Sequence, residues 1–385
     1  MGQQAVEKHL PSFSIVLETE NLVNADLKGL SQSLASLAQQ DVSPTHANEV
    51  WLIDSGDAPA NLLEQLCEKY PWIKVHQVPP GTGYYKAKML GAELSSGKIV
   101  VYFDSDCSYE TDWLRNILMP FTQEDQVQIV AGETMTRGLG IYGTAMVIAY
   151  IFPPFSGEKT LTPTTQYFLN NVAFRREFLL KHPIPTQLPL YRGNCAIHAY
   201  ELCQEGYTIW RQPQARATHA PPSNLSHFFW RFLLIGHDYY WQNTLLSQAN
   251  SDPVQRRIKS PELSREEKEK FAGFQSPGFI PGALVSRVNP KSKTRPQDAV
   301  RGRQDPKSND QDGYQDSMAG LKAKMKVFID RFGKMVRHEP RHLIYIPLAL
   351  PVALSAVALV ALGYIITSIK GNYLLKVYNH LVGEV

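Results

Sequence analysis

Apolar and polar residues alternate in two different periods between residues 12 and about 220. Short apolar runs rich in β-branched and aromatic residues predict strands, and the segments between them show the apolar spacing of helices. The predicted strands are 13–18, 49–56, 73–79 and 98–104, and the predicted helices are 26–40 and 84–96. This alternation predicts an α/β fold for residues 12–224.

The pattern changes after residue 224. Residues 225–248 are rich in aromatic residues, which predicts an amphipathic helix that either lies on a bilayer or packs as an ordinary core helix. Residues 249–320 are rich in Pro, Ser, Gln, Lys and Arg and predict a flexible polar linker. Residues 139–155 carry no charge but are short for a membrane span, so we interpret them as the wall of an apolar acceptor pocket or as a second membrane-touching segment.

A long uncharged stretch near the end of the chain, residues 343–369, contains 27 residues. Because about 20 apolar residues suffice to cross a bilayer, this stretch predicts a transmembrane helix. The preceding residues 321–342 form a basic juxtamembrane segment, and the short tail 370–385 holds few basic residues. The positive-inside rule therefore predicts a single-pass protein of the cytoplasmic membrane whose main domain faces the cytoplasm. The N-terminal tail, residues 1–11, lacks the apolar region of a secretory signal.

Charge and cysteine content narrow the classes of function. The net charge is +3, which does not indicate a nucleic-acid-binding protein. The four cysteines show neither a C-x-x-C pair nor a zinc spacing, which favours reduced thiols in a domain facing the cytosol.

Two aspartates, Asp104 and Asp106, follow the strand predicted at 98–104. Open α/β sheets bind their ligands at the carboxyl ends of strands. Neighbouring carboxylates repel each other unless a cation or a proton lies between them. An ordinary turn with two solvated acids is the alternative interpretation, and the surrounding motifs decide between the two.

Five segments resemble, in the same order, the family 2 glycosyltransferases. They are SIVLETENL (14–22), VWLIDSG (50–56), GTGYYKAKMLGAELSSGKIVVYFDSDCSYETDWL (81–114), FLNNVAFRREFL (168–179) and EGYTIWRQPQARATH (205–219). The resemblance covers residues 13 to about 220 and implies the GT-A fold, a Rossmann-like nucleotide-sugar-binding domain. Together with the apolar stretch it indicates a membrane-anchored enzyme of bacterial type.

The resemblance also implies residues that bind the nucleotide-sugar donor. Thr19, Glu20 and Asp54 would hold the base and ribose, and Asp104 the ribose or sugar. Lys88 stands where the family has a basic residue near the donor; an exposed helix lysine is the alternative. The family usually has Pro where this chain has Glu18.

A metal site is the third implication of the resemblance. Asp106 would bind a divalent cation, Mn²⁺ or Mg²⁺, and would act catalytically because the cation neutralises the charge of the leaving diphosphate. His219 stands where related enzymes supply a further metal ligand, with an ordinary strand-end histidine as the alternative. Hard oxygen ligands suit these cations.

The family's general base is missing from its usual place. Where the family carries a Glu-Asp pair, this chain has Asn194 and Cys195. His198 is the candidate base, because it lies about one helical turn further on and imidazole titrates near neutral pH. A Cys195 thiolate, Glu201 and Glu133 are further candidates.

Two functions remain open from the sequence. The first is transfer of a sugar, with inversion, from a nucleotide-sugar donor to a lipid-linked or otherwise apolar, membrane-associated acceptor. The second is a catalytically impaired GT-A scaffold that binds a nucleotide or a partner protein.

Overall fold

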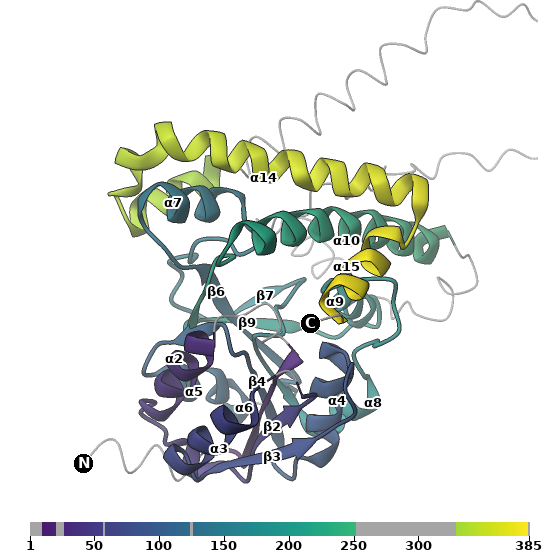
Figure 1. Ribbon diagram of the computed structural model, residues 1–385. Coiled ribbons are helices and arrows are strands. Elements are labelled where there is room, and N and C mark those ends of the chain that lie inside the picture. The colour runs from purple at the N-terminus through teal and green to yellow at the C-terminus, as the bar shows by residue number, and fades with distance from the viewer. Residues whose placement is uncertain (1–9, 21–26, 57, 124–125, 252–328, 384–385) are drawn as a thin grey trace, which may run out of the picture.

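The computed structural model describes residues 10–20, 27–56, 58–123, 126–251 and 329–383. Within these residues nine strands form one mixed sheet, in the order β3-β2-β1-β4-β8-β6-β9-β5, with β7 paired to β9 (Figure 1). The strands are β1 Phe13–Glu18, β2 Val50–Asp54, β3 Ile73–Gln77, β4 Ile99–Phe103, β5 Cys107–Tyr109, β6 Ile129–Thr136, β7 Thr162–Thr164, β8 Asn171–Arg175 and β9 Ile209–His219. The first four strands are parallel, whereas β8 runs antiparallel to both β4 and β6.

Helices cover both faces of the sheet. They are α2 Leu27–Ala38, α3 Ala60–Lys69, α4 Tyr84–Leu94, α5 Trp113–Leu118, α6 Pro120–Gln123, α7 Gly140–Ala149, α8 Arg176–Lys181, α9 Asn194–Gln204 and α10 Leu225–Ser251, followed by α14 His342–Lys370 and α15 Tyr373–Gly383. In β4, Val101 and Phe103 pack with α2 and α5, whereas Val100 and Tyr102 face the side of α4 and α8. A strand buried on both faces has a continuous apolar sequence, as β4 does. The mixed sheet with helices on both faces confirms the predicted α/β class.

A second layer of helices lies across one end of the sheet. In Figure 1, α14 runs along α10 with α7 beneath one of its ends. The packed face of α14 is made of small side chains, among them Ala349, Ala353 and Ala356, which contact a cluster that includes Phe232 of α10. The structure thus places α10 between α14 and the rest of the domain, as the core-helix interpretation of residues 225–248 expects.

The outward face of α14 is apolar. Among the described residues, α14 is the one helix long and apolar enough to cross a membrane. The large side chains that it exposes include Ile344, Leu348, Leu354, Val357 and Ile365. The helix extends by one residue at each end beyond the predicted stretch 343–369.

Most of the predicted polar linker lies outside the described residues. Helix α10 continues to Ser251, so the first residues of the segment 249–320 are helical. Of the basic segment 321–342, residues 329–338 form a helix that precedes α14. Arg331 of this helix is buried and donates to the carbonyl oxygen of Val147 (3.0 Å), which ties the segment to α7.

Two glycines allow α10 and α14 to approach closely. A Cβ atom at Gly363 would lie 2.1 Å from the carbonyl oxygen of Leu233, and one at Gly236 would lie 2.1 Å from that of Val360. Backbone atoms cannot move aside as a flexible side chain can, so we expect Gly363→Ala to destabilise the folded chain by about 1–3 kcal/mol. Thermal unfolding in detergent measures this effect. Gly333→Ala is the matched control, because its Cβ atom would meet nothing closer than 4.0 Å; equal losses in both variants would contradict the prediction.

Candidate functional site

A cavity of about 310 Å³ lies where the carboxyl end of β4 meets the helices of the second layer. Its walls come from the segment after β4, the end of β9, the residues that follow α7, the start of α9 and the first turns of α10. The lining residues that bear on the chemistry are Tyr84, Asp104, Asp106, Arg137, Tyr150, Arg192, Cys195, His219, His227 and Arg231. Three predicted site residues thus line the same cavity: Asp104, Asp106 and His219.

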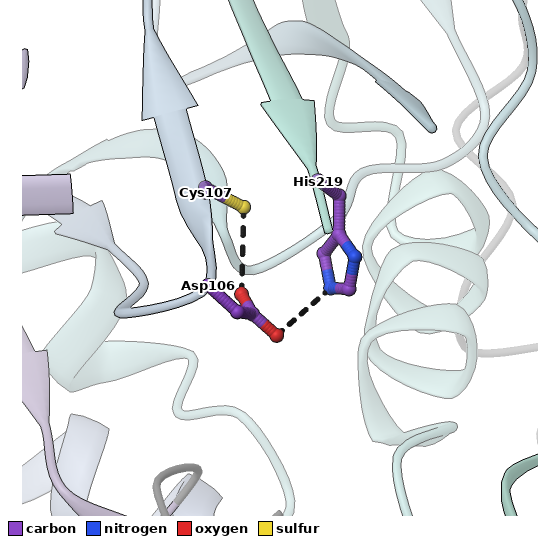
Figure 2. A group of neighbouring side chains, drawn as sticks. All are labelled: Asp106, Cys107 and His219. Atoms are coloured by element: carbon purple, nitrogen blue, oxygen red, sulfur yellow. Dashed lines mark hydrogen bonds and ion pairs between the residues drawn. The ribbon is translucent and has the colours of Figure 1, made fainter. Parts of the chain in front are cut away.

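The side chains of Asp106 and His219 point toward each other and are in direct contact (Figure 2). Strands β5 and β9 pair here, and they bring His219 Nε2 to 3.0 Å from Asp106 Oδ2. The other ring nitrogen, Nδ1, lies 2.5 Å from the carbonyl oxygen of Ala220, so it must donate a proton there. A neutral His219 therefore turns a lone pair toward a carboxylate, and two such acceptors repel unless a proton or a cation lies between them.

The charge of Asp106 fits a cation ligand. Burial raises the pKa of this carboxyl, but a proton on His219 and the positive charge of Arg231 outweigh burial and hold the pKa well below its usual range. Asp106 is therefore ionised at neutral pH. An ionised carboxylate oxygen beside an imidazole nitrogen fixed by a second hydrogen bond is a donor set that suits Mn²⁺ or Mg²⁺.

Cys107 completes a group of three possible ligands whose donor atoms lie within 4.8 Å of one another. Its Sγ donates toward Asp106 Oδ1 at 3.6 Å. Burial, with the charges of the neighbouring aspartates, raises the pKa of this thiol well above its ordinary value. A protonated thiol is a poor ligand for hard cations, so Asp106 and His219 are the residues that fit.

The Asp104 carboxylate accepts hydrogen bonds from two side chains of α4. Lys88 Nζ lies 2.6 Å from Asp104 Oδ1, and Tyr84 Oη donates to Oδ2 at 2.9 Å. The Lys88 side chain is fully buried and also donates to the carbonyl oxygen of Phe103. The interpretation of Lys88 as an exposed lysine is therefore wrong. Lys88 does not line the cavity but contacts Asp104, which does, and its role in donor binding stays a prediction.

Glu18 lies near this ion pair. Burial raises the pKa of Glu18 to about 8, although the Lys88 ammonium opposes the rise. Glu18 is therefore mainly protonated at neutral pH, which leaves Asp104 as the anionic partner of Lys88. At this position the resemblance leads us to expect Pro, and the chain accommodates the buried Glu18 side chain in its neutral form.

Three other predicted donor residues lie at the ends of β1 and β2. Thr19 Oγ1 donates to Asp54 Oδ1 at 2.9 Å, and the same carboxylate oxygen accepts the amide of Gly56 at 3.0 Å. Glu20 Oε2 lies 2.5 Å from Nη2 of Arg192, a residue that lines the cavity. The structure thus brings Thr19 and Asp54 together and links Glu20 to the cavity; their binding of a donor stays a prediction.

Three arginines in the cavity were not predicted as site residues. Arg192 stacks over the ring of Tyr84 with 4.5 Å to the centroid, and Arg137 donates to Ser108 Oγ at 3.1 Å. Arg231 of α10 donates to the hydroxyl of Tyr150 at 2.7 Å. For Arg231, the sequence did contain a signal: it is a charged residue within an aromatic-rich helix. Such a side chain needs a polar partner when the helix packs against the rest of the protein.

This geometry can be compared with known proteins. Residues 22–183 match the family described as glycosyl transferase family 2. Residues 22–183 are therefore similar to a family 2 glycosyltransferase domain. The match agrees over these residues with the resemblance that the sequence motifs indicated, and the mixed sheet with helices on both faces agrees with the expected α/β class.

Individual relatives are distant. The chain is 30% identical over 95 residues to N-acetylgalactosaminyltransferase 7 of Drosophila melanogaster, which is 23% of this chain and 16% of that protein. It is 27% identical over 107 residues to glycosyltransferase AglE of Haloferax volcanii, which is 27% of this chain and 34% of that protein. The chain therefore spans well under half the length of these curated relatives. The mannosyltransferase PcManGT from Pyrobaculum calidifontis, solved with GDP-Man and Mn²⁺, shares 13% identity with a TM-score of 0.47, over 94% of this chain and 93% of that chain.

His198 does not fit the role of a general base. Its Nε2 lies 3.0 Å from the carbonyl oxygen of His182 and its Nδ1 lies 2.7 Å from the hydroxyl of Tyr167, so both nitrogens are engaged. Burial lowers the pKa of His198 to about 4. The side chain is buried against Phe174 and does not line the cavity. The prediction of His198 as a catalytic residue is therefore wrong.

The other base candidates fail for different reasons. Cys195 does line the cavity, but burial raises the pKa of its thiol to about 11, so it is not a thiolate at neutral pH. Glu201 is exposed on α9, away from the cavity. Glu133 lines a separate pocket, where it accepts the amide of Ser156 at 2.9 Å.

Proposed function

We propose that this chain is a glycosyltransferase that moves a sugar, with inversion, from a nucleotide-sugar donor to a lipidic or membrane-associated acceptor, and that it depends on Mn²⁺ or Mg²⁺. One observation carries the proposal beyond the family match. The ionised Asp106 carboxylate faces the fixed Nε2 of His219 at 3.0 Å in a cavity that arginines also line. A divalent cation and a diphosphate together satisfy the charges of this arrangement.

The cavity residues have separate roles in this proposal. Asp106 and His219 would hold the cation, which supplies charge neutralisation to the leaving diphosphate when bound. Arg192 lies on the α4 side of the cavity, beside Tyr84 and Asp104, where it can contact a phosphate of the donor. Each oxygen of Asp104 accepts one bond from the protein and retains a lone pair for a ribose or sugar hydroxyl. Thr19, Glu20 and Asp54 would hold the base and ribose.

Membrane association is supported by α14. Its outward face presents large apolar side chains along the length of the helix. Water solvates such a face poorly, whereas lipid does not penalise it. We propose that the protein is attached to the cytoplasmic membrane through α14, with the glycosyltransferase domain in the cytoplasm, as the basic segment before α14 indicates. Crossing of the bilayer by α14 and the bacterial origin of the enzyme stay predictions.

Metal binding tests the proposed function before any acceptor is known. We expect His219→Ala to weaken Mn²⁺ binding by roughly tenfold or more, because it removes the imidazole ligand and its anchoring bond to Ala220. The measurement is titration of free Mn²⁺ by electron paramagnetic resonance, with purified full-length protein. His46→Ala, which removes an exposed histidine of the same domain, is the control. Equal affinity in the His219 variant and the parent would contradict the metal assignment.

The second candidate function is a binding scaffold without transfer activity. It is favoured by the failure of Cys195, His198, Glu133 and Glu201 as bases. The scaffold hypothesis predicts that the chain binds nucleotide-sugar with Mn²⁺ but neither transfers nor hydrolyses it with any lipid extract. Steady release of nucleoside diphosphate in the presence of lipid would exclude it.

A further inference from the structure

Helix α10 carries buried polar side chains at two places along its length. Its first turns supply His227 and Arg231, which line the cavity. A second group, His237, Asp238 and Gln242, is buried about two helical turns further on and does not line the cavity. Polar and charged side chains are seldom buried without hydrogen-bond partners. The partners of this second group therefore indicate what it does.

The Asp238 carboxylate bridges two consecutive backbone amides. Its Oδ1 accepts the amide of Tyr191 at 2.6 Å, and its Oδ2 accepts the amide of Arg192 at 2.8 Å. Both amides belong to the connection between α8 and α9, residues 182–193, all of which are described and form neither helix nor strand. Buried amides outside regular structure need an acceptor, and a carboxylate is a strong one. Asp238 therefore supplies the hydrogen bonds that a sheet or helix would otherwise provide.

The same stretch of backbone is held on both sides of this bridge. His237 Nε2 donates to the carbonyl oxygen of Pro189 at 3.1 Å. Gln242 Nε2 lies 3.5 Å from the carbonyl oxygen of Gly193, and a Cβ atom added at Gly193 would lie 2.4 Å from that nitrogen. Residues 189–193 thus pack directly against α10, and the position of their backbone depends on this face of the helix.

The charge of Asp238 is part of the bridge. Burial raises the pKa of this carboxyl to about 6, although the two amide bonds and the charges of Arg231 and Arg192 oppose the rise. The side chain is therefore mainly ionised at neutral pH. An ionised carboxylate accepts on both oxygens, whereas an amide in its place would turn its NH₂ group toward one of the two backbone N–H groups.

The two bridged residues, Tyr191 and Arg192, both line the cavity. The Arg192 guanidinium stacks over the rings of Tyr84 and Tyr191, at 4.5 Å and 4.6 Å from the two centroids. Its Nη2 lies 2.5 Å from Glu20 Oε2. The Tyr191 ring also lies 5.7 Å from the guanidinium of Arg231. A shift of this backbone would therefore move both an arginine of the cavity and the ring on which two arginines stack.

We propose that Asp238 is a positioning residue for donor binding, which fixes the backbone of Tyr191 and Arg192 and so holds the Arg192 guanidinium where it meets a phosphate oxygen of the nucleotide-sugar. The inference rests on the proposed function, which gives Arg192 this contact with the donor. Asp238 does not touch the ligand and acts through Arg192. A binding group that is already ordered loses less conformational entropy when its ligand arrives, so the bridge increases the affinity for the donor.

Asp238→Asn tests this inference with full-length protein in detergent. The probes are UDP and GDP with Mn²⁺, and the one that the parent binds more tightly is used throughout. We expect the variant to bind this nucleotide roughly tenfold more weakly, with unchanged affinity for free Mn²⁺, because Asp106 and His219 are not altered. Asp41→Asn is the matched control: it alters a carboxylate that is bonded to Arg115 and does not line the cavity, so both affinities should stay at the parent values. Equal loss of nucleotide and Mn²⁺ affinity in the Asp238 variant would overturn the inference.

A double-mutant cycle separates positioning of Arg192 from a general structural role. If Asp238 acts through Arg192, Asp238→Asn added to Arg192→Gln should weaken nucleotide binding by less than about twofold. A tenfold loss in both backgrounds would overturn the inference, and so would an Asp238→Asn protein that binds nucleotide as tightly as the parent. Asp238→Ser, which removes the ionised acceptor without crowding the site, replaces Asp238→Asn if that variant does not fold, with the same expected losses. A parent that binds neither UDP nor GDP would instead overturn the proposed function itself, before any variant is compared.

Discussion

Asp106→Ala is expected to lower the rate of sugar transfer by roughly a thousandfold or more, the scale on which preorganised electrostatic stabilisation of a transition state is lost. The carboxylate is ionised and faces His219 Nε2 at 3.0 Å, so its removal takes away the charged ligand of the proposed cation. The fold should persist, because the side chain follows the end of β4 and contributes nothing to the apolar clusters on either face of the sheet.

Transfer rates and Mn²⁺ titration, measured side by side, check this expectation. Asp112→Ala is the matched control, since Asp112 is an exposed acid of the same segment whose side chain makes no capping bond to α5. We expect the control to keep both the activity and the metal affinity of the parent. An Asp106 variant that transfers sugar at the parent rate, with the same dependence on Mn²⁺, would show that the cation binds elsewhere.

The sequence predicted the central strands β1 and β4 because they are buried on both faces. Residues Ile99–Phe103 are all buried, so the run of apolar residues before Asp104 could be recognised without tertiary information. The position of Asp106 followed from the same logic, since a strand end in an α/β sheet is where ligands bind. Local pattern thus located the charged end of the cavity, and the family motifs added its partner His219.

The sequence could not predict which way the residues of α9 point. Cys195 and His198 are three positions apart and share one face of the helix, yet Cys195 reaches the cavity and His198 is held by Tyr167 and by the carbonyl oxygen of His182. Both of these partners come from other segments, so helical spacing alone could not reveal them. Arg231 was hidden for the same reason: α10 brings it beside Asp106 from a position 125 residues later in the chain.

Lys88→Met is expected to reduce the free energy of unfolding by about 3–5 kcal/mol, the cost of leaving one charge of a buried ion pair without its partner. Lys88 is fully buried with its Nζ 2.6 Å from Asp104 Oδ1, and the variant would leave that carboxylate with the Tyr84 hydroxyl as its remaining side-chain donor. Lys86→Met is the control, because Lys86 is exposed on the same helix and its replacement should change stability by less than about 0.5 kcal/mol.

Urea unfolding in detergent measures both variants, and a double variant separates charge from packing. If the loss comes from the unpaired carboxylate, Asp104→Asn added to Lys88→Met should recover a large part of it, because a neutral amide is much less costly to bury than a lone carboxylate. The double variant should bind nucleotide-sugar more weakly than the parent. The amide introduced by Asp104→Asn lacks the negative charge of the carboxylate that we propose accepts a hydrogen bond from the donor hydroxyl. A Lys88→Met protein as stable as the Lys86 control would show that Asp104 does not depend on this lysine, and would reopen the assignment of Lys88 to the donor.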